Sequence, residues 1–312
     1  LEQDMDMTQL LERRKRMKRS VKKLGKIALL GVAILFTTTG CKSDDMEDIE
    51  IVTTNYPNEY IIERLYGDHA KVSNIYPDGI DVNDYKFTNK QKKDFASKDL
   101  FIYTGLVDRE RSLAVELLDY NKDLKIIDSS YVLDNDYEMD EVWLDPSFML
   151  MMSQNVRIGL KEYIENNYLK EEIDENYEEL KVDISELDAN IRLAVESAPY
   201  KTIVATDNNY KFLEKYGVKV YILNDDTSEK DLVEINDLVE SGNITKIFSY
   251  EDIKTTNNVQ NLINTYPNNL EVINSNRIIV LNDEQRKTKT DYITLMNQNL
   301  DNIKEELYHS NS

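Results

Sequence analysis

The stretch ISELDANIRLAV, residues 184–195, decides the fold because its apolar residues recur at the spacing of one helix face. Four residues form that face: Ile184, Leu187, Ile191 and Val195. The surrounding region, residues 147–197, contains no strand candidate, no proline, and no glycine after Gly159. We therefore predict one continuous helix between about Ile173 and Ser197, long enough to join two separate lobes.

Strand and helix patterns alternate on both sides of this helix. Short runs rich in β-branched and aromatic residues are the strand candidates: Ile49–Thr53, Lys71–Ile75, Leu100–Tyr103, Leu124–Ile127, Thr202–Ala205, Lys219–Leu223, Lys246–Ser249 and Arg277–Leu281. Amphipathic stretches separate them: Glu59–Tyr66, Asn89–Ala96, Arg109–Leu118, Tyr210–Lys215, Lys230–Glu240 and Asn257–Thr265. This alternation is typical of parallel βαβ units.

The predicted fold class is therefore α/β, with two lobes on parallel-type sheets joined by a long rigid helix. We expect an N-terminal lobe at residues 49–170, the linking helix at 171–198 and a C-terminal lobe at 199–312.

Composition argues against several function classes. The 312 residues include 59 acidic and 38 basic side chains, and the net charge of −21 opposes binding to nucleic acid. Two histidines, His69 and His309, and one cysteine cannot build a Cys/His zinc cage and leave few options for an activated nucleophile. With nine glycines and no phosphate-cradling Gly-rich loop, the chain is not expected to be an enzyme.

The N-terminal sequence is typical of an export signal. A basic stretch, residues 13–26, precedes an apolar run of about ten residues, 27–36, which is too short to span a bilayer and fits a signal peptide. The junction Thr37-Thr-Thr-Gly-Cys41 resembles the lipobox of bacterial lipoproteins, which implies a lipid anchor on Cys41.

We expect residues 1–40 to be the signal peptide, with 1–16 an upstream extension if translation starts at Met17, and 41–48 to be a tether. The alternative is an ordinary signal peptide with a chance cysteine.

Several motifs, in order along nearly the whole remaining chain, carry a family resemblance. They are Thr54-Asn-Tyr-Pro57, Tyr76-Pro-Asp-Gly-Ile-Asp81, Asp99-Leu-Phe-Ile-Tyr-Thr-Gly-Leu106, Val142-Trp-Leu-Asp-Pro146 and Tyr210-Lys-Phe-Leu-Glu-Lys-Tyr-Gly217. As a set they resemble the zinc/manganese cluster (cluster A-I) of ABC-transporter solute-binding lipoproteins. That resemblance implies a metal held in a cleft between the two lobes.

The resemblance also implies where the metal ligands would lie, and every histidine of the family pattern is replaced there. The positions are Asn83, Glu141, Asp207, and Asn282 or its neighbour Asp283. Carboxylate and amide oxygens suit hard cations such as Mn²⁺, Mg²⁺ or Ca²⁺, whereas zinc favours imidazole and thiolate. We expect Mn²⁺ or another hard cation to be favoured over Zn²⁺ as the transported ligand, with loss of metal binding as the alternative. Neither His69 nor His309 is expected to restore the site, because both are predicted to be solvated.

The resulting hypothesis is an extracytoplasmic solute-binding protein, lipid-anchored to the cell membrane, that delivers its solute to an ABC permease and ATPase. The alternative is a surface lipoprotein with an adhesive or regulatory role and a non-binding cleft. The presence of permease and ATPase genes beside its own would favour the first.

Overall fold

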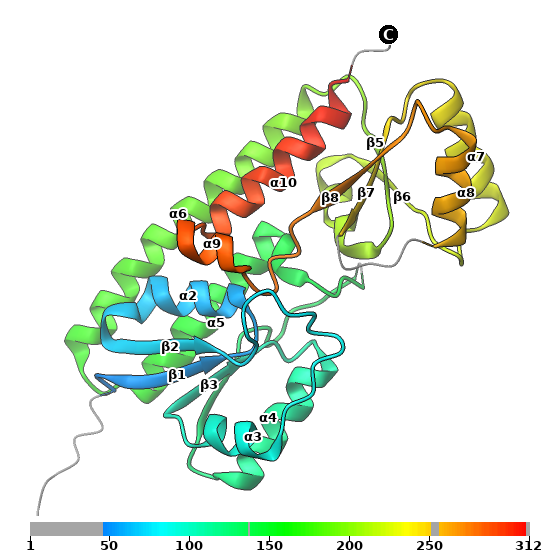
Figure 1. Ribbon diagram of the computed structural model, residues 1–312. Helices are drawn as coiled ribbons and strands as arrows, with labels where there is room; N and C mark the ends of the chain where they lie inside the picture. The colour runs from blue at the N-terminus through cyan, green and yellow to red at the C-terminus, as the bar shows by residue number, and fades with distance from the viewer. Residues whose placement is uncertain (1–45, 137, 251–255, 310–312) are drawn as a thin grey trace, which may run out of the picture. The chain divides into compact units, whose positions relative to one another are not determined.

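The computed structural model describes residues 46–136, 138–250 and 256–309. These residues form two four-stranded parallel sheets (Figure 1). The first, in the order β2-β1-β3-β4, contains β1 (Ile49–Thr53), β2 (Ala70–Asn74), β3 (Leu100–Tyr103) and β4 (Lys125–Asp128). The second, in the order β6-β5-β7-β8, contains β5 (Thr202–Ala205), β6 (Lys219–Ile222), β7 (Lys246–Tyr250) and β8 (Glu271–Ser275). The two α/β lobes predicted from the alternation are thus confirmed.

Helices cover the sheets and connect them. Those associated with the first sheet are α2 (Tyr56–Tyr66), η1 (Gly67–His69), α3 (Asn89–Ala96), α4 (Asp108–Tyr120), η2 (Val142–Leu144) and α5 (Pro146–Tyr163). The others are α6 (Asn167–Glu196), η3 (Asn208–Tyr216), α7 (Glu229–Glu240), α8 (Asn257–Thr265), α9 (Asp283–Thr288) and α10 (Tyr292–Leu307). Many begin at a capping side chain: the Ser228 hydroxyl accepts a hydrogen bond from the Asp231 amide at the start of α7, as the sequence predicted.

Helix α6 is the connecting element. Its 30 residues rise about 45 Å at 1.5 Å per residue. The predicted apolar face is buried along its length, and the helix packs against α2 and α5 near the first sheet and against α10 near the second. One hydrophobic core therefore runs along α6 and includes residues from both lobes.

The eighth strand differs from the prediction. The expected strand Arg277–Leu281 is irregular, and β8 lies six residues earlier, at Glu271–Ser275. The apolar side chains of this run pack into the hydrophobic core instead. The carbonyls of Ile279 and Leu281 accept hydrogen bonds from amides of the first lobe, both at 2.8 Å. The real strand pairs only with β7 and is largely exposed, so its sequence carries a weak hydrophobic signal.

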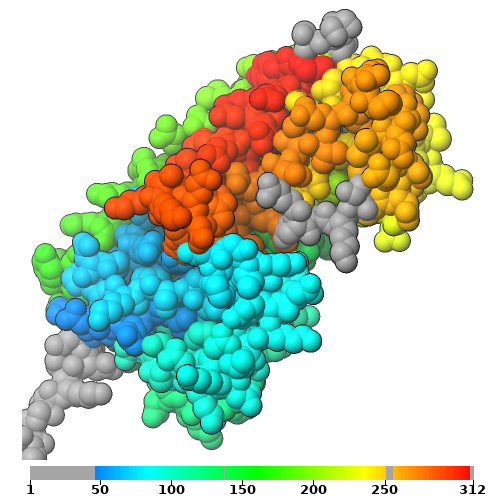
Figure 2. All heavy atoms as spheres, in the orientation of Figure 1, coloured from blue at the N-terminus to red at the C-terminus, as the bar shows by residue number. Residues whose placement is uncertain are grey.

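The segment that follows β8 therefore attaches to the first lobe. In Figure 2 the orange α9 lies against the blue and cyan atoms of that lobe. The Arg286 guanidinium forms an ion pair with both carboxylate oxygens of Glu59, at 2.8 Å for Nη2, and a second with Asp78 at 3.0 Å.

No helix within residues 46–136, 138–250 and 256–309 is long and apolar enough to cross a bilayer. The predicted signal peptide and the proposed anchor, Cys41, lie outside the described residues.

Candidate functional site

Glu141 borders a cavity of about 400 Å³ that is lined by both lobes. It ends the loop that follows β4 and immediately precedes the short helix η2. The charged lining comprises four carboxylates and two guanidinium groups, from Asp108, Glu110, Asp140, Glu141, Arg109 and Arg277. Acidic groups outnumber basic ones, so the cavity favours a cationic occupant.

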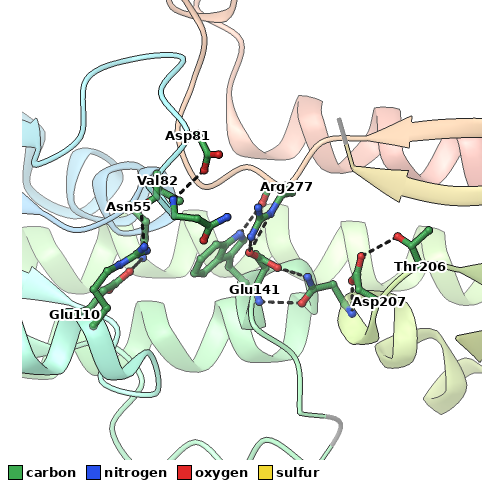
Figure 3. Close-up of polar contacts among 12 residues, drawn as sticks. Asn55, Asp81, Val82, Glu110, Glu141, Thr206, Asp207 and Arg277 are labelled. Carbon is green, nitrogen blue, oxygen red and sulfur yellow. Dashed lines mark hydrogen bonds and ion pairs between the residues drawn. The ribbon is translucent and has the colours of Figure 1, made fainter. Parts of the chain in front are cut away.

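Residues of the sequence motifs noted above hold Glu110, which lines the cavity. Glu110, at the start of α4, is fully buried and accepts hydrogen bonds from the Thr104 amide at 2.8 Å and from the Thr54 hydroxyl. Asn55, which caps α2, also donates to it at 3.4 Å (Figure 3). Burial raises the pKa of Glu110, while these donors oppose the shift. The motif residues therefore fix the ends of β1 and β3 beside the cavity.

Glu141 is 1% exposed, and both of its carboxylate oxygens are hydrogen-bonded. Arg277 donates to Oε1 from Nε at 3.0 Å and also from Nη2, forming an ion pair between the lobes (Figure 3). The Asn209 side-chain nitrogen donates to Oε2, while Oδ1 of the same side chain accepts from the Glu141 backbone amide at 2.9 Å. Burial raises the pKa of Glu141 to about 7, against the opposing effect of Arg277.

Asp207 lies close to this cluster from the second lobe. It caps η3 by accepting from the Asn209 amide at 2.8 Å, and the Thr206 hydroxyl donates to its other oxygen at 3.3 Å. Burial raises the pKa of Asp207 as well. Asn209 thus links the two carboxylates, since its backbone binds Asp207 and its side chain binds Glu141.

The other three positions implied by the family pattern, Asn83, Asn282 and Asp283, differ in whether they share a cavity with Glu141. Asn83 lines the same cavity but is exposed, and its amide donates to Asp81 at 2.9 Å. Asn282 does not follow a strand; it caps α9 by accepting from the Gln285 amide at 2.9 Å. It borders a second cavity of about 280 Å³, and Asp283 is exposed in the first turn of α9. Asn83 therefore shares a cavity with Glu141, and Asp207 is connected to Glu141 through Asn209 without lining that cavity. Asn282 and Asp283 lie outside it.

A preformed metal cage is not found among the described residues, where no three His, Cys, Asp or Glu side chains cluster suitably. The expected solvation of both histidines is wrong. His69 pairs with Glu172 at 3.0 Å, and His309 stacks on Tyr200 with ring centroids 4.2 Å apart. Both histidines are partly buried away from Glu141, each held by its own contacts.

The sequence did not predict two of the site residues, Asn209 and Arg277. Arg277 was assigned to a strand because it opens an apolar run. The rarity of arginine in the second lobe could have indicated this residue. Residues 199–312 contain only two arginines, Arg277 and Arg286, and each pairs with acidic residues of the first lobe.

Comparisons with known proteins identify the family of this chain. The family model described as "Zinc-uptake complex component A periplasmic" matches residues 51–306. The high-affinity zinc uptake system protein ZnuA of Bacillus subtilis (strain 168) is 22% identical over 296 residues, covering 87% of this chain and 91% of that protein.

Solved structures share the fold. The metal-dependent lipoprotein YcdH from Bacillus subtilis superposes with a TM-score of 0.68 at 21% identity, covering 83% of this chain and 99% of that one. The Zn(II)-bound ZnuA-like domain of AdcA from Streptococcus pneumoniae gives a TM-score of 0.66 at 24% identity, covering 83% and 99%. With the family model spanning both lobes and the linking helix, this chain belongs to the ZnuA family of periplasmic components of ABC metal importers.

Proposed function

We propose that this protein is the extracytoplasmic solute-binding component of a metal-type ABC importer, which takes a divalent cation between its lobes and delivers it to a permease and ATPase. The observation that carries the proposal is Glu141, a buried carboxylate in a predominantly acidic cavity lined by both lobes. Support also comes from membership of the family.

The affinity for the cation is proposed to come from Glu141 and Asp207. They approach from different lobes, and Asn209 joins them. The negative charge of Asp207 acts on the buried Glu141 carboxylate, and a divalent ion bound near both would relieve that repulsion. Asn83 would contribute an amide oxygen from the cavity wall.

Oxygen donors favour a hard cation over zinc. No imidazole or thiolate lines this cavity among the described residues, so Mn²⁺ is proposed ahead of Zn²⁺ as cargo. The affinity expected of two carboxylates and neutral amides is micromolar, about −8 kcal/mol.

Calorimetry with Mn²⁺, Ca²⁺ and Zn²⁺ tests the proposal. Glu141→Gln/Asp207→Asn should abolish Mn²⁺ binding. The matched control is Glu59→Gln/Asp78→Asn, which removes two carboxylates from the Arg286 ion pairs outside this cavity and should leave binding intact. Tight zinc binding by the wild type would contradict the preference for a hard cation, and binding that survives the Glu141/Asp207 change would contradict the site.

We also propose that Cys41 carries a lipid anchor and holds the protein at the outer face of the cell membrane. The proposal rests on the apolar run and the Thr39-Gly40-Cys41 junction.

A second candidate is favoured by one observation, the engagement of both Glu141 oxygens by Arg277 and Asn209. In that case the protein is a surface lipoprotein with an adhesive or regulatory role whose cleft binds no metal. Absence of binding to all three cations would favour this candidate.

A further inference from the structure

Arg277 lies where the proposed cation would bind. Its side chain is 14% exposed, and two of its guanidinium nitrogens contact Oε1 of Glu141. Its backbone is held by the same segment, since its carbonyl accepts a hydrogen bond from Nε1 of Trp143 at 2.9 Å. The backbone and the side chain of Arg277 are therefore both bound to residues 141–143 of the first lobe.

A guanidinium group stays protonated throughout the physiological pH range. Arg277 therefore gives Glu141 a permanent positive partner that belongs to the protein itself. A divalent cation bound to Oε1 would need the position that the Arg277 nitrogens occupy, and the two like charges would repel each other. Arg277 and a divalent cation therefore compete for this oxygen.

A second cavity could accept the Arg277 side chain when it leaves Glu141. Arg277 also lines the second cavity of about 280 Å³. Four side-chain amides border that space: Asn274, Asn276, Asn282 and Gln285. Three of their oxygens already accept one hydrogen bond, and an amide oxygen can accept a second from a guanidinium group. Arg277 thus lies between two cavities, one that contains Glu141 and one that does not.

We propose that Arg277 is a built-in competitor that sets the cation affinity of the cleft, and that a divalent ion binds Glu141 only when Arg277 has left it. This inference rests on the proposed metal-binding function. The apparent dissociation constant then exceeds the intrinsic one, because only the fraction of molecules with Arg277 withdrawn can bind. Removing the guanidinium charge should tighten binding.

The test is Mn²⁺ titration of the mature chain at pH 7.5, followed by calorimetry and by the fluorescence of Trp143. Trp143 is the only tryptophan, is buried, and donates to the Arg277 backbone, so its emission should report movement at this point. The variants are Arg277→Gln, which removes the charge, and Arg277→Lys, which keeps it. Arg286→Gln is the matched control, because that arginine pairs with Glu59 and Asp78 outside this cavity.

We expect Arg277→Gln to bind Mn²⁺ at least tenfold more tightly than the wild type, with Arg277→Lys between them and Arg286→Gln unchanged. Should Arg277→Gln fail to fold, Arg277→Lys against Arg286→Gln still tests the inference, because the lysine loses the two-nitrogen contact and should also tighten binding. Unchanged or weaker binding by both Arg277 variants, with a wild type that binds, would overturn the inference and leave the proposed function standing.

A wild type that binds no cation distinguishes the two proposals. If the wild type binds no cation but Arg277→Gln does, Arg277 is a competitor and the native protein is not a metal receptor. If no variant binds, both proposals fail.

Discussion

Replacing Glu141 with glutamine should change how stability depends on pH. Glu141 is almost fully buried, and burial raises its pKa from 4.5 to about 7 despite the adjacent Arg277. Asp140 and Asp207 add to the shift through their negative charges. Between pH 4.5 and 7 the folded protein therefore binds more protons at this group than the unfolded chain does. Stability contributed by this group is present at low pH and is lost as the pH rises through 7.

The size of the effect follows from the shift. One pKa unit corresponds to 1.36 kcal/mol, so ionising Glu141 in the folded state costs about 3 kcal/mol relative to the unfolded state. Glu141→Gln does not titrate, and its Arg277 remains protonated over the whole range. The stability of the variant therefore does not depend on pH through this position, and the pH-dependent part of the difference isolates Glu141.

Urea denaturation of both proteins from pH 5 to 8.5, followed by Trp143 fluorescence, measures this difference. The free energy of unfolding of the wild type, relative to that of the variant, should fall by about 3 kcal/mol from the lowest to the highest pH. A difference that stays constant would show that the pKa of Glu141 is not raised. A difference that grows with pH would show that pairing with Arg277 outweighs burial, and would reverse the reasoning.

Three further predictions concern stability and anchoring. Arg286→Gln leaves the buried Glu59 carboxylate without its partner and should lower the free energy of unfolding by about 2 kcal/mol; an unchanged urea midpoint would contradict a stabilising role for this pair. Gly159→Ala places a Cβ atom 2.7 Å from Cγ1 of Ile127, where α5 packs on β4, and should cost about 1–3 kcal/mol; a thermal midpoint equal to that of the wild type would refute the close approach. Cys41→Ser should release the protein from the membrane fraction or leave it unprocessed, and a processed variant that stays membrane-associated like the wild type would argue against the lipid anchor.

Most of the fold could be predicted because its signals are local. The expected bounds of β1, β3 and β5 match the structure, as do those of α3 and α8, since each has its own periodicity and flanking turn or cap residues. The error at Arg277–Leu281 has a different origin. Its apolar residues pack against the other lobe, and neither composition nor alternation distinguishes that from a strand.

The site was predictable only in part. Family resemblance pointed to Glu141 and Asp207, which precede recognisable motifs and are connected through Asn209. Their partners could not be found in this way. Arg277 is 136 residues from Glu141 in the sequence, and Asn209 is 68 away, so no local pattern records either contact.

These contacts bear on how selectivity is inferred for such a cleft. The donor atoms at the family positions suggest a hard cation, but they account only for the negative and neutral groups of the cleft. The positive groups come from the segment after β8, which belongs to the second lobe by connectivity. This segment binds the first lobe through Arg277 and Arg286. In a chain with a net charge of −21, these two guanidinium groups neutralise buried carboxylates between distant parts of the sequence. A cation that binds Glu141 must therefore replace an existing internal cation. Its affinity depends on where Arg277 can go as much as on which oxygens remain.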